Sequence, residues 1–380
     1  MVERDNLHYT FRRIDGYDQA FNFVISGREA GKSTNFFIEK AYPIWKKHKA
    51  PVLFLVRNIV EITEGLLTTM QDVVINKFFD DNVKFQYSKA SMRDGVVDVK
   101  INGVLFMRVE ALSITLRKIK QTILHNVSFI VFDEFIINPR MQEKYLPDEA
   151  FKFKELYTTN KRDRFDQTKP LKVYWLGNPY SLYNPYFVWL GISPAKLQFG
   201  KIYNNENCVV DYYKISLGLR EKILKENPAY EFDEDYISYA LEGKPVLDKN
   251  IKLGKLPQNY HLRFVFQQEN KYIGVFQNNY WEDHADIYFC CFLSQKEISN
   301  RRVAYCFNFK DLISRSILLS NEDRNKFNKF KIAMRKRLVA FQSIDCYYLI
   351  EEIYYNLWAI KLYYTQIAKF FLGKTFQLMI

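Results

Sequence analysis

Residues 21–34 read FNFVISGREAGKST, and this stretch decides the fold of the chain. An apolar strand, Phe21–Ile25, leads into a loop of small and polar residues, and a helix is expected to open at Gly31. The loop matches the phosphate-binding pattern G-x-x-x-x-G-K-[ST] from its second glycine onward. Because strand, loop and helix follow in the order that this motif requires, the stretch predicts a nucleoside triphosphate site.

The residues of this loop have separate expected roles. Lys32 should reach the β- and γ-phosphates, and the Ser33 hydroxyl should hold Mg²⁺. Ser26 stands where the pattern has its first glycine, and serine is small enough that we expect the loop to remain active. Backbone N–H groups of the loop and of the helix start form an anion site. The predicted nucleotide-binding set is Ser26, Gly27, Arg28, Glu29, Ala30, Gly31, Lys32, Ser33 and Thr34.

A second apolar strand ends in two adjacent carboxylates. Residues 127–135 read VSFIVFDEF, so Asp133 and Glu134 emerge at the carboxyl end of the strand, where ligands bind in open α/β sheets. Asp133 suits a contact to Mg²⁺ through water, and Glu134 suits the general base that polarises the attacking water. The pair therefore predicts hydrolysis of the bound nucleotide.

A third apolar strand, Val173–Leu176, ends in Gly177 and Asn178. A polar side chain at this point suits a sensor of the γ-phosphate, and a plain turn before Pro179 is the alternative. We expect Asn178 to have the sensor role.

Residues 160–163 read NKRD, which matches a guanine-specificity pattern, but the sequence argues against a GTPase. That motif should end an apolar strand, whereas this one follows a helical segment, and the glycine that a GTPase needs after its second strand is Ile136 here. The tandem Asp-Glu favours an ATPase instead. Arg162 and Arg164 are then candidates for an arginine finger offered to a neighbouring site, with a solvated basic helix end as the alternative.

The order of the elements predicts an α/β fold with a mainly parallel sheet flanked by helices. A hairpin is expected at Asn102-Gly103, between Val96–Ile101 and Val104–Val109. We expect an ATPase domain over residues 1–205, a linker or small helical subdomain over 206–255, and an α+β domain over 256–380. The last domain should begin with strands at 262–266, 271–276 and 286–292 and continue as helix from about residue 322.

The composition indicates the kind of partner and argues against a zinc site, a disulfide framework and a membrane protein. The net charge of +12 favours a polyanionic partner, nucleic acid first. The five cysteines show no C-x-x-C spacing, so neither a zinc site nor a disulfide framework is expected, and a reducing cytoplasm fits. The sequence contains no signal peptide and no apolar run of eighteen residues, so no contact with a membrane is expected.

Four stretches together resemble a known family. SGREAGKS, FIVFDEFI, YLPDEAF and LGNPYSLYNPYF are similar to the DNA-packaging ATPases, or encapsidation proteins, of short-tailed phages with protein-primed genomes. These are relatives of the terminase large subunit, and the similarity is good over residues 17–190. The resemblance implies an ASCE-type P-loop ATPase that forms a homo-oligomeric ring, a pentamer in the family, on the procapsid portal in the host cytoplasm. It implies ATP and Mg²⁺ as cofactors, double-stranded DNA and the portal as partners, and a structural RNA as a further candidate.

Carried over by position, the resemblance gives roles to further basic residues. Arg28 occupies the arginine position of the phosphate loop, Arg162 falls where the family places its trans-acting finger, and Arg164 is the fallback. Lys120 matches a basic position of the channel-facing region. A motor that holds DNA of any sequence should contact phosphates. The predicted contacts are Arg117, Lys118 and Lys120, and, in a second basic cluster, Lys331 and Arg335, with a solvated surface as the alternative for both groups.

The resemblance also implies a vestigial RNase H-like nuclease in the last domain. A two-metal nuclease needs converging carboxylates, but the first expected strand, LRFVF, has none, and a turn of solvated acids accounts for Glu282, Asp283 and Asp286. Rival hypotheses are an active terminase-like nuclease, an adaptor that binds nucleotide without hydrolysing it, and a helicase. Tyr17 and Gln19, before the first strand, are candidates for contacts to adenine, with a plain loop as the alternative.

Overall fold

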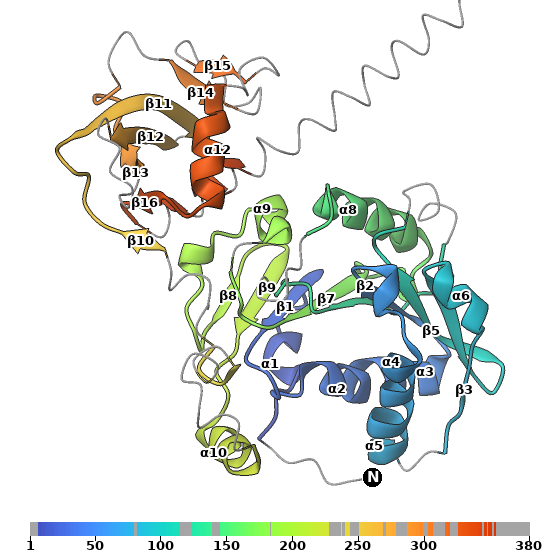
Figure 1. Cartoon of the computed structure of the whole chain (residues 1–380). Helices are drawn as coiled ribbons and strands as arrows, with labels where there is room; N and C mark the ends of the chain where they lie inside the picture. The colour runs from blue at the N-terminus through green and yellow to red at the C-terminus, as the bar shows by residue number, and fades with distance from the viewer. Residues whose placement is uncertain are drawn as a thin grey trace, which may run out of the picture. The chain divides into compact units, whose positions relative to one another are not determined.

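The computed structural model divides into two units, Met1–Leu247 and Asp248–Ile380, and each is described by itself (Figure 1). The described residues are 7–79, 82–114, 123–138, 145–182, 184–227, 237, 240–243, 251–268, 271–278, 287–298, 303–306, 316–319, 326–343, 346–347, 349–351 and 353–354. The basic residues Arg117, Lys118 and Lys120, and the acids Glu282, Asp283 and Asp286, lie outside them.

The first unit is built on a nine-stranded sheet in the order β3-β4-β5-β2-β6-β7-β1-β9-β8. Its parallel part includes β2 (Val52–Val56), β6 (Phe129–Asp133), β7 (Lys172–Gly177), β1 (Phe21–Ile25) and β9 (Cys208–Tyr212). These strands are near-continuous apolar runs because helices cover both faces of a parallel sheet. The predicted mainly parallel α/β sheet is confirmed.

The two faces of the sheet can be assigned from β7. Successive side chains of a strand point to opposite faces, so Tyr174 and Trp175 mark the two sides. The Tyr174 ring lies 5.3 Å from Phe36 of α2 (Lys32–Phe36), and the Trp175 ring lies 4.8 Å from Phe153 of α8 (Glu149–Asn160). Helix α2 therefore covers one face and α8 the other (Figure 1).

The hairpin is also confirmed: β4 (Val96–Ile101) and β5 (Val104–Ala111) pair antiparallel, and Asn102 and Gly103 have φ of 51° and 79°, as a tight turn of this kind requires. We expected the helix after the phosphate loop to end at about Ala41, before Tyr42 and Pro43, but it continues past them. A π-helical turn (Phe37–Ala41) joins α2 to α3 (Tyr42–His48). Pro43 does not end the helix because it lies in the first turn of α3, where proline is tolerated.

The first unit extends beyond residue 205, where we expected its boundary. Strand β9 is fully buried and pairs in parallel with β1, so it is part of the central sheet rather than of a linker. Helix α10 (Leu217–Glu226) and residues 240–243 belong to the same unit. Because the region has a mixed, charged composition, the short buried strand β9 was not predicted from the sequence.

The second unit contains a seven-stranded sheet. Strands β11 (Tyr260–Gln268), β12 (Lys271–Asn278) and β13 (Tyr288–Leu293) form the expected antiparallel meander, while β14 (Ala304–Cys306) and β15 (Ser316–Leu318) add in parallel beside β11. Strand β16 (Val339–Phe341) lies within the stretch that we expected to be helical, because it pairs with β13.

The remaining elements are shorter. They are α1 (Arg12–Asp15), α4 (Glu64–Thr68), a π-helical segment (Thr69–Asn76), α5 (Lys77–Phe79), α6 (Lys89–Arg93), α9 (Pro185–Leu190), α12 (Asn328–Arg335), 3-10 helices (Ile59–Glu61, Lys161–Asp163 and Pro194–Lys196), β3 (Phe85–Gln86), β8 (Ile202–Asn204) and β10 (Lys252–Leu253). All five cysteines are free and buried. Within the described part of the chain, no helix has the length and apolar character needed to span a membrane.

Candidate active site

The phosphate loop joins β1 to α2 at the carboxyl end of the parallel strands. Gly31 caps the helix with φ of 79°, and a Cβ there would lie 3.2 Å from the side chain of His8, so both conformation and space favour glycine. Ser26, at the position of the missing first glycine, is fully buried, and its N–H donates to the Gly177 carbonyl at 3.2 Å. The serine therefore fits within the loop.

Lys32 and Asn178 meet, as expected for residues that share a phosphate site. The Lys32 ammonium donates to the Ser26 carbonyl at 3.1 Å, the Gly27 carbonyl at 2.9 Å, the Ser26 hydroxyl at 3.2 Å and Asn178 Oδ1 at 3.1 Å. Burial lowers the pKa of Lys32 to about 8, and nearby Asp133 and Glu134 act in the opposite direction. When ATP binds, phosphate oxygens would replace the carbonyls of the loop as hydrogen-bond acceptors for the Lys32 ammonium.

We predict that ATP binding weakens as the pH rises above 8. The cationic form of Lys32 is the form that binds phosphate, and its lowered pKa of about 8 means that this form is lost as the pH rises through that value. The dissociation constant for ATP should be nearly constant below pH 7 and should rise by up to about tenfold per pH unit above 8. Equilibrium titration of the unmodified chain with a non-hydrolysable ATP analogue checks this; a flat profile from pH 7 to pH 9.5 would contradict it.

The residues assigned to Mg²⁺ also lie together. Asp133 is the last residue of β6, and its carboxylate accepts a hydrogen bond from the Ser33 side chain. Burial raises the pKa of Asp133, while Ser33 and Lys32 lower it, so a nearby cation would favour the ionised form. Mg²⁺ is commonly held by one or two protein oxygens together with substrate phosphates and water. A hydroxyl and a carboxylate that face each other beside a phosphate loop fit this ion.

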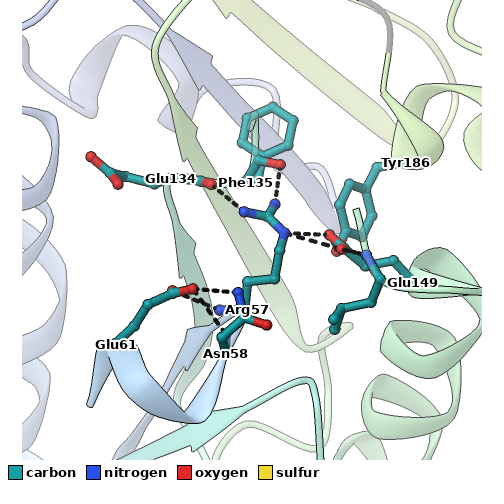
Figure 2. A network of polar contacts seen from close by, with 8 residues as sticks. Arg57, Asn58, Glu61, Glu134, Phe135, Glu149 and Tyr186 are labelled. Atoms are coloured by element: carbon teal, nitrogen blue, oxygen red, sulfur yellow. Dashed lines mark hydrogen bonds and ion pairs between the residues drawn. The ribbon is translucent and has the colours of Figure 1, made fainter. Parts of the chain in front are cut away.

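Glu134 is exposed and has an unusual backbone. Its φ is 54°, a left-handed conformation that costs a non-glycine residue about 1 kcal/mol or more. Two contacts hold this backbone: the Glu134 N–H donates to Asp133 Oδ1 at 3.0 Å, and the Glu134 carbonyl accepts from Arg57 at 3.3 Å. The side chain points away from the Arg57 guanidinium (Figure 2).

Arg57, directly after β2, is the centre of a buried network that sequence reasoning did not assign to the site (Figure 2). Its Nε lies 3.0 Å and 3.2 Å from the two carboxylate oxygens of Glu149, and its Nη2 donates to the Phe135 carbonyl at 2.6 Å. Glu149 is itself fully buried and accepts from the Tyr186 hydroxyl at 2.9 Å. This network ties the start of α8 to the backbone of Glu134. A charged residue at the end of an apolar strand was its only signal in the sequence.

Arg28 is half-buried beside the loop, and its Nη2 donates to the Tyr180 hydroxyl at 2.9 Å. Tyr180 follows Asn178 after β7, so one short segment contacts both Lys32 and Arg28. The Arg28 side chain therefore stays beside the phosphate loop of its own chain.

The structure does not bring Arg162 to the site of its own chain. Arg162 lies in the 3-10 helix after α8, where Val127 forms a bridge with Arg164 just before β6 begins. Asp133 and Glu134 lie at the other end of β6, and five strand residues span about 17 Å. The candidate finger and the phosphate loop thus occupy opposite edges of the sheet.

Two segments beside the loop were missed in the sequence. The Tyr9 N–H donates to the Ala30 carbonyl at 2.9 Å, and Asn35 of α2 donates to the Tyr9 carbonyl, so residues before α1 line the loop. On the other side, a Cβ on Gly27 would lie 1.7 Å from the Ala240 carbonyl. The backbone of residues 240–241 therefore covers the loop, and nothing local in the sequence marked this contact.

We predict that Gly27→Ala disrupts the site. The added Cβ cannot coexist with the Ala240 carbonyl, so either the loop or the covering segment must move, which should cost about 1–3 kcal/mol of stability and weaken ATP binding. Gly16→Ala is the matched control, because a Cβ there meets nothing within 4 Å. Thermal unfolding and ATP titration of both variants check the prediction; equal behaviour of the two would contradict it.

Two further candidates of the first unit do not lie at the phosphate loop. Tyr17 and Gln19 precede β1 and therefore lie at the edge of the sheet opposite the phosphate loop, and Gln19 donates to the Asn205 carbonyl at 3.0 Å, so the structure does not bring these two candidates for adenine contacts to the loop. In the second unit, α12 buries Phe330 and leaves Arg335 exposed and Lys331 half-buried. The described residues contain no cluster of three or more His, Cys, Asp or Glu side chains that could hold a metal.

Comparison with known proteins identifies the family. The family model described as Podovirus DNA encapsidation protein (Gp16) matches residues 4–359. The DNA packaging protein of Bacillus phage B103 is 25% identical over 319 residues, which cover 81% of this chain and 88% of that protein. The DNA packaging protein of Bacillus phage phi29 is 29% identical over 193 residues, which cover 50% of this chain and 52% of that protein.

A solved structure supports the fold over the same extent. The structure of the Phi-28 gp11 DNA packaging motor aligns with a TM-score of 0.59 and 17% identity, covering 93% of this chain and 98% of that chain. At this identity the likeness concerns the fold alone. The family match spans nearly the whole sequence, and the chain belongs to the Podovirus DNA encapsidation protein (Gp16) family.

Proposed function

We propose that this protein is the ATPase of a phage DNA-packaging motor, which hydrolyses ATP to drive double-stranded DNA through the portal into a procapsid. The observation that carries the proposal is the convergence of Lys32, Ser33, Asp133 and Asn178 at one edge of the sheet. Membership of the encapsidation family supports the same conclusion.

The geometry supports a specific division of labour. The loop amides and Lys32 bind the phosphates, and Ser33 and Asp133 hold Mg²⁺, which would neutralise charge on the phosphate oxygens. Glu134, exposed beside this pair, accepts the proton of the attacking water. Asn178 loses its bond with Lys32 when the ammonium turns to phosphate oxygens, so the segment after β7 would respond to the presence of nucleotide.

The proposed partners follow from charge and family. The protein acts in the host cytoplasm at the portal vertex as a homo-oligomeric ring, a pentamer as in the family, with a structural RNA as a further candidate. Double-stranded DNA is held through its phosphates by Lys331 and Arg335 of α12, and by Arg117, Lys118 and Lys120, which lie outside the described residues. The second unit is proposed to grip DNA or dock on the portal without cutting.

Steady-state ATP hydrolysis, with and without double-stranded DNA, tests the proposal. We expect turnover that DNA stimulates and that rises more than linearly with protein concentration, because a ring supplies residues between copies. Tight ATP binding without turnover, at a concentration where the protein oligomerises and with DNA present, would favour the nucleotide-switched adaptor. Metal-dependent cleavage of plasmid DNA would favour the nuclease, and displacement of a paired strand would favour a helicase.

A further inference from the structure

We infer that residues 160–165 form a fixed mount that presents Arg162 to a neighbouring copy of this chain, with Asn160, Asp163 and Arg164 as positioning residues. The inference rests on the ring of the proposed function and on the trans action of Arg162 that the family resemblance implies. It assigns different roles to two arginines that are two positions apart and carry the same charge.

The mount begins at Asn160, the last residue of α8. Its side chain is almost completely buried, with 1% of the residue exposed. Asn160 Nδ2 donates to the Leu156 carbonyl at 3.0 Å, and Oδ1 accepts from the Leu124 N–H at 2.9 Å. Because one amide bonds both its own helix and the segment that leads into β6, the end of α8 is fixed to the central sheet.

Asp163 fixes the turn to the same segment. The Val127 N–H donates to the Asp163 carbonyl at 3.3 Å, and the Phe165 N–H donates to the Val127 carbonyl at 2.8 Å. The Asp163 carboxylate lies 2.5 Å from Nδ1 of His125. Backbone and side chain thus hold the residues on both sides of Arg162 against the entry to β6.

Arg164 donates hydrogen bonds to backbone carbonyls of its own turn from all three nitrogens of its guanidinium. Its Nη1 donates to the Lys161 carbonyl at 2.8 Å, its Nη2 to the Gln167 carbonyl at 2.9 Å, and its Nε to the Lys169 carbonyl at 2.5 Å. These three bonds, one from each guanidinium nitrogen, close the turn and hold the guanidinium against its own backbone, which leaves it poorly placed to reach a phosphate on another molecule. Arg164 is therefore a structural clamp.

Arg162, in the same turn, differs from Arg164 in its exposure and in its contacts. It is exposed, and it has no hydrogen bond or ion pair with any residue that the structure describes. It also lies at the edge of the sheet opposite its own phosphate loop. A rigid turn that leaves one guanidinium unbound suits delivery into a second site, because pre-positioning removes the cost of ordering the side chain during the reaction.

Single substitutions separate the two arginines. Arg162→Ala and Arg162→Lys should lower kcat by about 10³-fold or more with little change in KM, as the loss of an arginine finger does. Arg164→Lys keeps the charge but replaces the planar guanidinium, whose three nitrogens each reach a different carbonyl, with a single ammonium nitrogen, and should lower kcat by about tenfold through misplacement of Arg162. Lys161→Ala is the control: its side chain is exposed and only its carbonyl takes part, so it should behave as wild type. A 10³-fold loss in Arg164→Ala beside a wild-type rate in Arg162→Ala would overturn the inference.

Mixing experiments distinguish the inference from the proposed function. Glu134→Gln subunits keep an intact mount and Arg162, so adding them to Arg162→Ala subunits should restore hydrolysis if the arginine acts in trans. The same addition should restore Arg164→Lys, with melting temperatures recorded for every variant. Failure to restore Arg162→Ala would contradict trans action itself. If the Glu134→Gln subunits restore hydrolysis with Arg162→Ala but not with Arg164→Lys, the proposed function would stand, and the positioning role of residues 160–165 would be contradicted.

Discussion

Replacing Glu134 with glutamine is expected to lower kcat for ATP hydrolysis by about 10²–10⁴-fold while leaving ATP binding intact, since general-base catalysis contributes about that much. Glutamine preserves the shape of the side chain but cannot accept a proton from water. The backbone contacts of Glu134 to Asp133 and Arg57 use its N–H and carbonyl, so they survive the change. Single-turnover hydrolysis and equilibrium ATP titration measure the two effects separately.

Glu206→Gln is the matched control for this variant. It also removes an exposed carboxylate, but residue 206 precedes β9 and lies at the opposite edge of the sheet, so wild-type turnover is expected. Retention of wild-type turnover in Glu134→Gln would place the base elsewhere. Loss of ATP binding in the same variant would show that Glu134 shapes the site rather than activating water.

Replacing Arg57 with alanine is expected to destabilise the first unit by about 3–5 kcal/mol, because it leaves the fully buried carboxylate of Glu149 without its charged partner. The burial of both groups is what makes the loss large, since exposed pairs contribute little. Turnover should fall as well, because the Glu134 and Phe135 carbonyls lose their donor. Urea unfolding and steady-state hydrolysis provide the two measurements.

A double variant separates these two effects of Arg57. Arg57→Met with Glu149→Gln removes both buried charges while keeping an oxygen for the Tyr186 hydroxyl, so most of the stability should return. The Glu134 carbonyl still lacks its donor, so kcat should remain low. Recovery of both stability and kcat would mean that Arg57 acts on the fold alone and does not position Glu134.

The relative positions of residues that depend on the local order of strands and loops could be predicted from the sequence. The loop of residues 26–34 and the acids after β6 meet because the carboxyl ends of parallel strands share one edge of a sheet, and the same rule placed Asn178 beside Lys32. The meander of the second unit was predictable from alternating apolar runs, and the hairpin from Asn102-Gly103. Local pattern and strand order were sufficient for these features.

Features that depend on contacts distant in the sequence could not be predicted. Arg57 pairs with Glu149 across 92 positions, and the Ala240 carbonyl covers Gly27 from a region that reads as a charged linker. Strand β16 has only three residues and exists because it pairs with β13 and β10, so a helical propensity in the neighbouring sequence outweighed it in our prediction. In each case the partner, and not the segment itself, decides the structure.

The most direct test of the account is a packaging assay with cognate procapsids, in which DNA that has entered the head survives nuclease treatment. We predict ATP-dependent protection of double-stranded DNA with the wild-type chain and none with Glu134→Gln. Protection without ATP hydrolysis, or equal protection with Glu134→Gln, would contradict the central claim that turnover at this site moves the DNA.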